Sequence, residues 1–248
     1  MANETRCVHC LEPLVEGTAD HVFPSSWYPE TTPKEIQRWT VPSCAKCNNK
    51  LGGIEKDLLV KLGLCIDPAL AEASGIPAKA LRSVGVGVGD LKEREKFHRA
   101  KHKQKVLAQM KSYAEIKGKP GFLPGFGLHG GFPEEIQSAI LVPAASLTAL
   151  SEKIARGLEF KIAGKYVEPP YAARTYFTEN DASEQLANLF AKASETHLGP
   201  GFKVFRIAAT DNPNIVIYRM IVWGTLIIHV CIDEETAFGR LGEPKVGN

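Results

Sequence analysis

Two short pairs of cysteines near the N-terminus have the spacing of metal-binding knuckles. Cys7 and Cys10 form the first pair, and Cys44 and Cys47 form the second. Each C-x-x-C pair puts two thiolates about one turn apart, and two such pairs complete the four-sulfur shell that structural zinc prefers. Because four protein ligands leave no position for water, the expected role of this Zn2+ is structural.

A redox dithiol is the competing interpretation of a C-x-x-C pair. It would require one pair at the start of a helix in a βαβ context, which the sequence lacks, and it would leave the other pair unexplained. His9 lies between the first two cysteines and could replace one of them as a ligand, but its place in the knuckle predicts an exposed side chain. The spacing therefore favours zinc held by four cysteines.

A second group of residues, between and just after the knuckles, could act on phosphate. Asp20 and His21 begin the sequence DHVFP, and Asn48 directly follows the second knuckle. A carboxylate and an amide oxygen are hard ligands suited to Mg2+ or Mn2+. A neutral imidazole titrates close to neutrality and can take a proton from water. These residue types suit metal-assisted hydrolysis of a phosphodiester bond.

Taken together, the motifs CVHC, DHVFP and CAKCNNK resemble those of the HNH endonuclease superfamily. The resemblance covers roughly residues 7–56 and is closest to the four-cysteine, Asn-ended variety, which includes an enzyme that resolves branched DNA. It implies a ββα-metal fold, with Asp20 and Asn48 as ligands of a divalent cation and His21 as the general base. It also implies DNA cleavage that leaves 5′-phosphate and 3′-hydroxyl ends.

The sequence departs from the HNH pattern at the middle asparagine. No Asn occurs between His21 and Asn48, and Trp39 or its neighbours stand where that residue would be. Because the missing amide normally holds the loop that orients the histidine, His21 needs another partner, such as a backbone carbonyl. Neighbouring residues on a strand also point to opposite faces, so Asp20 and His21 can share a site only where the strand is irregular or ends.

The elements that would position these residues follow in the order strand, loop, strand, helix. Residues 19–27 and 37–43 are predicted to be extended, and residues 44–64 to be mainly helical. The segment is rich in Cys, Pro, Gly and Asn and has only short apolar runs, so it cannot bury enough core to fold unaided. Zinc binding would supply the missing stability.

At 248 residues the chain exceeds the usual single domain, and we expect an α+β protein with two domains. The predicted parts are an HNH nuclease module with structural zinc, a linker with a basic helix, and an α+β accessory domain of unknown role: residues 1–66, 67–120 and 121–248. In the last part the patterns predict one strand, two helices capped by Ser146 and by Asp181 or Ser183, and an antiparallel three-strand meander. Their ranges are 138–143, 146–160, 183–198, 202–209, 214–223 and 225–232.

Basic residues are concentrated in the segment 92–119, which holds ten of them against three acidic residues. Because the formal net charge of the chain is only +2, affinity for nucleic acid would have to come from such a local cluster. The candidate phosphate-binding residues are Lys50, Lys96, Arg99, Lys101, Lys103 and Lys105. A solvated helix face explains the same run equally well.

The leading hypothesis is a divalent-metal-dependent endonuclease acting on duplex or branched DNA. Two alternatives stay open: a zinc-braced nucleic-acid-binding protein without catalysis, and a nuclease that acts on RNA. No apolar run reaches the roughly 20 residues of a membrane span, and the N-terminus lacks a secretory signal, so a cytoplasmic protein without a membrane partner is expected. Assembly into a homodimer is left open.

Overall fold

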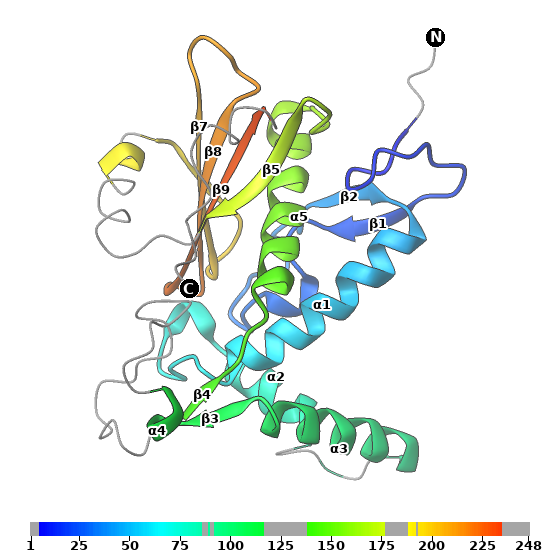
Figure 1. The fold of residues 1–248 in the computed structure, drawn as a ribbon, viewed down its shortest axis with the longest axis vertical. Coiled ribbons are helices and arrows are strands. Elements are labelled where there is room, and N and C mark those ends of the chain that lie inside the picture. The colour runs from blue at the N-terminus through cyan, green and yellow to red at the C-terminus, as the bar shows by residue number, and fades with distance from the viewer. Residues whose placement is uncertain are drawn as a thin grey trace, which may run out of the picture.

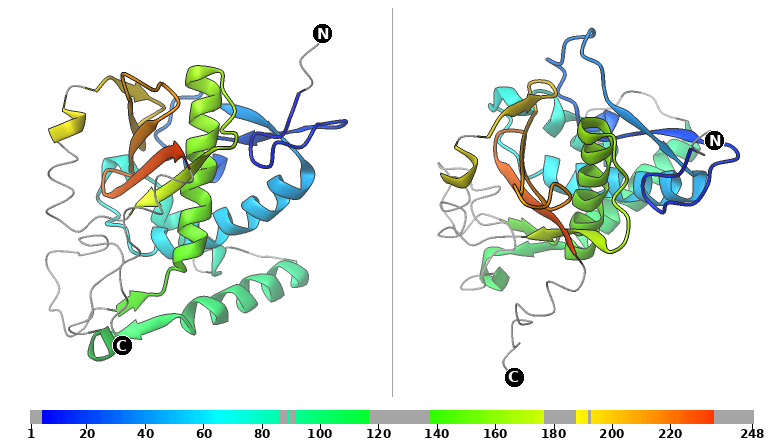
Figure 2. Two further views of the ribbon diagram at one scale, coloured as in Figure 1. Left: turned by 45° about the horizontal axis from the view of Figure 1, so that its top comes forward. Right: turned by 90° about the horizontal axis from the view of Figure 1, so that it is seen from above.

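The computed structural model describes residues 5–85, 89, 92–116, 138–176, 188–191 and 193–234. It is a mixed α/β structure with an antiparallel sheet, and helix α5 (Ala144–Ala163) runs through its middle. The five-stranded sheet lies on one side of α5, and the N-terminal hairpin and helix α1 lie on the other (Figures 1 and 2). Among the helices of the described residues, none has the length and apolar character needed to cross a membrane.

The N-terminal part forms a β-hairpin followed directly by a helix. Strands β1 (Thr18–His21) and β2 (Thr40–Ser43) are antiparallel, and the loop between them contains the 3-10 helix η1 (Ser25–Trp27). Helix α1 (Ala45–Gly63) begins after Cys44, whose extended backbone and sulfur acceptor form the N-cap. The predicted order of strand, loop, strand and helix is confirmed.

The last six residues of α1, from Leu58 to Gly63, are buried, and the helix contacts helix α2 (Ile76–Ser83), which follows the 3-10 helix η2 (Ala71–Ala73). Helix α3 (Glu93–Leu107) contacts α2 and buries only Val106 of its own residues.

The basic helix predicted between residues 67 and 120 was expected to extend through residues 91–119, but α3 ends at Leu107. After α3 the chain forms strand β3 (Met110–Ser112) and the short helix α4 (Tyr113–Ile116), and residues 117–119 lie outside the described residues. β3 pairs with the predicted strand at residue 138, β4 (Ser138–Ile140). Pairing with this distant segment overrides the local preference for helix.

Helix α5 begins two residues earlier than predicted, so Ser146 is not its cap. Pro143 stands at the N-cap, and its carbonyl accepts hydrogen bonds from the backbone N–H groups of Ser146 and Leu147. Proline suits this boundary because it has no N–H and its φ is fixed close to the helical value. The helix ends at Gly164, whose φ of 66° is in the left-handed region that favours glycine.

The sheet has the strand order β5-β9-β8-β7-β6, and all neighbours are antiparallel. Its strands are β5 (Tyr171–Tyr176), β6 (Glu195–His197), β7 (Phe202–Ala208), β8 (Val216–Val222) and β9 (Leu226–Glu234). The predicted meander is confirmed as β7-β8-β9, whereas β5 was not predicted.

The second predicted helix, 183–198, is wrong at its C-terminal end. Residues Glu195–His197 form β6 and pair with β7, which satisfies their backbone groups in a ladder instead. The proposed caps Asp181 and Ser183 lie outside the described residues.

One buried apolar cluster joins the hairpin, α1, α5 and the sheet. Trp27 from the N-terminal loop and Trp223 from the β8–β9 turn are both 0% exposed, and their ring centroids are 4.7 Å apart. Trp223 Nε1 also donates a hydrogen bond of 2.8 Å to the backbone oxygen of Trp27. The first 66 residues therefore share their core with the C-terminal part of the chain.

We expect a histidine in β9 to make stability depend on pH. His229 is 3% exposed, its Nε2 has no partner among the described residues, and burial together with the charge of Arg219 lowers its pKa to about 4, from 6.5. At a pH between these two pKa values, His229 binds a proton in the unfolded chain but not in the native state. The free energy of unfolding should therefore decrease as the pH falls from 6.5 through 4, by up to about 3 kcal/mol.

A His229→Phe variant isolates this contribution, because phenylalanine fills the ring position beside Phe190 without titrating. Denaturant unfolding at neutral pH and near pH 4 should show a smaller acid loss for the variant than for the wild type. Equal losses would mean that other groups cause the pH dependence.

Candidate functional site

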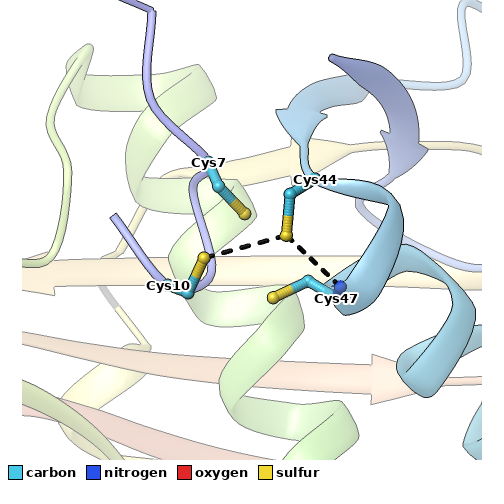
Figure 3. A group of neighbouring side chains, drawn as sticks. All are labelled: Cys7, Cys10, Cys44 and Cys47. Atoms are coloured by element: carbon cyan, nitrogen blue, oxygen red, sulfur yellow. Dashed lines mark hydrogen bonds between the residues drawn. The ribbon is translucent and has the colours of Figure 1, made fainter. Parts of the chain in front are cut away.

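The four predicted zinc ligands come together at the start of the hairpin–helix unit. Cys7 and Cys10 lie on the N-terminal turn, whereas Cys44 and Cys47 flank the first turn of α1, and all four side chains converge (Figure 3). Their sulfur atoms all lie within 4.8 Å of one another. The Cys10–Cys44 separation is 3.8 Å, and tetrahedral Zn–S bonds of about 2.3 Å require about 3.8 Å between sulfurs. The cluster is compatible with structural zinc.

The pKa values of these thiols differ in a way that opposes ionisation of all four together in the absence of a metal. Burial opposes ionisation of Cys7, but the backbone N–H groups of Cys44, Cys10 and His9 outweigh it and lower the pKa of Cys7 to about 6. By contrast, burial and the neighbouring Cys44 thiol raise the pKa of Cys47 far above its ordinary value. Four thiolates cannot coexist at this spacing without a metal, and Zn2+ would supply the compensating charge.

Asp20 lies on β1 and is 5% exposed. Its Oδ2 is 2.9 Å from His9 Nε2, and its Oδ1 is 3.0 Å from Lys153 Nζ. Burial opposes the charge on Asp20, but the His9 hydrogen bond and the Lys153 charge outweigh it and lower the pKa of Asp20. Both oxygens of this predicted metal ligand are thus already engaged by the protein.

Lys153 on α5 is the centre of a buried charged network that joins the hairpin to helices α1 and α5. Besides Asp20, its ammonium donates to Glu55 Oε1 of α1 at 2.5 Å and to the backbone oxygen of His21 at 2.6 Å. The Lys153 side chain is 1% exposed, and that of Glu55 is 15% exposed. All three N–H donors of the ammonium have an acceptor, which is what a buried charge requires.

A glycine lets α5 approach β1 closely enough for these contacts. Gly157 lies one turn after Lys153, and a Cβ added there would be only 3.0 Å from Cγ2 of Val22. Val22 follows directly after β1, so this contact brings the helix backbone against the end of the strand that carries Asp20. A side chain at 157 would therefore require Val22 or the helix backbone to shift.

The prediction that His9 is solvated is wrong. Its side chain is 4% exposed, its Nε2 binds Asp20, and its Nδ1 is buried without a partner among the described residues. The His9 ring lies against the Asp20 carboxylate of β1. His9 therefore connects the zinc knuckle to the candidate site.

His21 lies opposite Thr40 in the hairpin, one position beyond the Asp20–Val41 pair. The strand pairing continues through both residues, so their side chains leave the strand on opposite faces. The Nδ1 of His21 is buried, and no hydrogen-bond partner for it occurs among the described residues, so the expected carbonyl partner is not observed. Burial lowers the pKa of His21, although the charge of Asp20 partly opposes this, and the ring is neutral at neutral pH.

Asn48 lies in the first turns of α1 and is half-buried. Its Nδ2 donates a hydrogen bond of 3.0 Å to Thr18 Oγ1, and no hydrogen bond joins its amide oxygen to Asp20 or His21. Thr18 and Asp20 are two residues apart on β1 and so share a face of the hairpin. Asn48 and Asp20 therefore belong to one hairpin–helix unit, on the same side of β1.

These residues do not fit Mg2+ or Mn2+ in their present arrangement. A cation could reach the Asp20 carboxylate only by replacing Lys153 or His9, and the Lys153 ammonium would repel it. Within the described part of the chain, the four cysteines are the group of His, Cys, Asp and Glu side chains close enough together to hold a metal.

The candidate phosphate-binding residues do not gather around Asp20. Lys50 is exposed on α1, whereas α3 runs along the far edge of the molecule from the hairpin (Figure 1). On α3, Lys96 pairs with Glu93 and the Arg99 guanidinium donates to the backbone oxygen of Arg82. Lys101, Lys103 and Lys105 are exposed and have no ion pair with any residue that the structure describes.

Sequence reasoning missed Lys153 and Glu55. A signal for Lys153 existed, because it lies three residues after Leu150 and one before Ile154, on the stripe of α5 that is buried. A lysine within an apolar stripe implies a buried partner, but its identity depends on contacts 98 and 132 residues away. Sequence spacing alone could not supply them.

No family model, no curated protein and no solved structure matches this chain.

Proposed function

We propose that this chain is an HNH-type endonuclease that hydrolyses phosphodiester bonds in DNA. The observation that carries the proposal is the single hairpin–helix unit β1-β2-α1, which carries Asp20, His21 and Asn48 and contributes Cys44 and Cys47 to the four-cysteine cluster. This order of elements and residue types is the one that the HNH resemblance implies, and it supports assigning the reaction to this unit.

His21 is the proposed general base. Burial keeps its imidazole neutral, so it can accept a proton from an attacking water at physiological pH. The expected products carry 5′-phosphate and 3′-hydroxyl ends. A divalent cation, Mg2+ or Mn2+, would stabilise the charge on the phosphate when bound, and Asp20 would have to exchange a partner to hold it.

The test is a cleavage assay with purified, zinc-loaded protein and a His21→Ala variant. Removal of a general base typically costs roughly 10²- to 10⁴-fold in rate, so cutting of supercoiled plasmid or a branched junction should fall at least about 100-fold. The reaction is run with Mg2+, with Mn2+ and with neither, and the zinc content is measured after each run. RNA of the same length is the competing substrate.

A His197→Ala variant is the matched control, because this histidine is exposed on β6 and outside the proposed site. It should cut like the wild type. Undiminished cutting by a folded His21→Ala variant would rule out the assigned base, and preferential cutting of RNA would transfer the proposal to RNA.

A zinc-braced nucleic-acid-binding protein without catalysis is the second candidate. The engagement of both Asp20 oxygens by His9 and Lys153 favours it, because a carboxylate fixed in this way serves the fold. The exposed lysines of α3 would then provide the contacts to phosphate. DNA binding by the wild type without cutting under any of the three metal conditions would support this candidate.

A further inference from the structure

Arg38 is an exposed cation on the face of the hairpin that carries His21. The pairing of β1 with β2 continues past His21 to Val22, whose backbone N–H donates to the Trp39 carbonyl at 2.9 Å. Arg38 precedes Thr40, the residue opposite His21, by two positions, and side chains alternate between the two faces of an extended chain. The side chains of Arg38 and His21 therefore leave the hairpin on the same side.

The electrostatics of His21 agree with this placement. Burial is the largest cause of its lowered pKa; the charge of Asp20 opposes the shift, whereas those of Lys153 and Arg38 add to it. The Lys153 side chain is only 1% exposed and is enclosed by its acceptors, so a ligand in solvent cannot reach it. His21 is half-buried with its Nδ1 turned inward, so its Nε2 is the nitrogen on the solvent side, as Arg38 is.

Most donors of the Arg38 guanidinium are available to a ligand. The group packs over the Tyr28 ring, 4.8 Å from its centroid, and one N–H donates a long hydrogen bond of 3.4 Å to the Ser25 backbone oxygen. A guanidinium has five N–H donors, and in the part of the chain that the structure describes the others have no hydrogen-bond partner and no carboxylate pairs with the group. The ring holds the cation in place while its remaining donors stay open.

The charges around the 3-10 helix η1 favour an anion. Lys79 Nζ donates to the backbone oxygen of Tyr28 at 2.6 Å. Burial is the main cause of the lowered pKa of Lys79, and the charges of Arg38 and Arg82 add to it. The three cations are therefore close enough to repel one another, and Glu30, 3.5 Å from Arg82, neutralises part of their charge. A bound phosphate would relieve the remaining repulsion.

We propose that Arg38 binds a phosphate group of the nucleic acid beside His21, through two N–H groups of its guanidinium. The planar fork of arginine matches two oxygens of a phosphate, and such charge-assisted hydrogen bonds are stronger than neutral ones. The inference rests on the proposed function for the role of His21 and for the kind of substrate. It gives the site a permanent positive charge, which does not require Asp20 to leave His9 and Lys153.

The experiment titrates zinc-loaded protein with inorganic phosphate at neutral pH and constant ionic strength, without Mg2+ or Mn2+. The ring C–H signals of His21 are followed by NMR and are identified by their absence from the spectrum of His21→Ala. We expect these signals to shift to saturation in the wild type. Arg38→Gln should weaken the phosphate affinity at least roughly tenfold, and Arg38→Lys, which keeps the charge but loses the fork, should weaken it less.

Arg94→Gln is the matched control, because Arg94 is also exposed but lies on α3, along the far edge of the molecule from the hairpin (Figure 1). It should keep the wild-type phosphate affinity. A wild type without a saturable shift, a shift that chloride reproduces, or equal affinities of the wild type and Arg38→Gln would overturn the inference. Because the titration involves no cleavage, a protein that binds phosphate through Arg38 but does not cut DNA would support the inference and refute only the endonuclease activity.

Discussion

Cys44→Ser should abolish zinc binding and, with it, the cooperative unfolding of the whole chain. Structural zinc in small modules contributes roughly 10–16 kcal/mol, which equals or exceeds the stability of a typical domain, about 5–15 kcal/mol. The loss should spread beyond the knuckles because the hairpin and α1 share one buried cluster with α5 and the sheet. Zinc content per chain and denaturant unfolding followed by tryptophan fluorescence measure both effects.

The serine substitution removes Cys44 as a metal ligand but keeps a hydrogen-bond acceptor at the N-cap of α1. The Cys44 sulfur accepts a hydrogen bond from the Cys47 backbone N–H at 3.4 Å, and a serine hydroxyl is a better N-cap than a thiol. Any loss therefore reports the missing metal ligand. Cys65→Ser is the control, because Cys65 is outside the cluster and burial raises its pKa to about 11, so it is a neutral thiol. Wild-type unfolding by a zinc-free Cys44→Ser protein would contradict the structural role of the metal.

Trp223→Ala should lower the free energy of unfolding by about 3–5 kcal/mol, the usual cost of removing a buried aromatic ring. The indole is fully buried, packs at a tilt against the Trp27 ring and donates a hydrogen bond to the Trp27 backbone oxygen. Because the buried cluster that joins the hairpin, α1, α5 and the sheet extends well beyond this contact, the wild type and the variant should both unfold in a single transition. Calorimetry measures the midpoint and the number of transitions.

A Trp223→Phe variant tests how much of the lost stability comes from the ring and how much from the N–H donor. Trp223→Phe keeps an aromatic ring but removes the N–H donor, so it should cost less than the alanine variant. Both substitutions meet the same left-handed backbone, since φ at Trp223 is 53°. Two separated transitions in the alanine variant, with the zinc-binding half unaffected, would show that the two parts are stabilised independently.

Local patterns predicted much of this fold. The C-x-x-C pairs identified the four residues that converge, and alternating apolar residues identified β7, β8 and β9 together with their turns. The turn at Trp223 and Gly224 has two positive φ values, of 53° and 74°, as a tight hairpin between twisted strands requires. These features depend on neighbours in the sequence.

Features that depend on distant neighbours were missed. β3 forms because the distant strand β4 pairs with it, although the local sequence favours helix there. β6, which also lies in a segment predicted to be helical, pairs with β7 across a short turn. The same limit applied to the candidate site, where the partner of Asp20 is 133 positions further along, at Lys153. The presence of Asp20 could be read from the sequence, but the ammonium that holds it could not.

The shared core determines whether the N-terminal part can be expressed or fused to another protein without the rest of the chain. A fragment ending near residue 66 would carry Val22, Phe23 and Trp27 into water, although each is at most 1% exposed in the whole chain. It would also leave Asp20 without its counter-charge. Residues 1–66 therefore do not form an independently stable unit. A fusion protein that contains them should stay soluble only if it also contains α5.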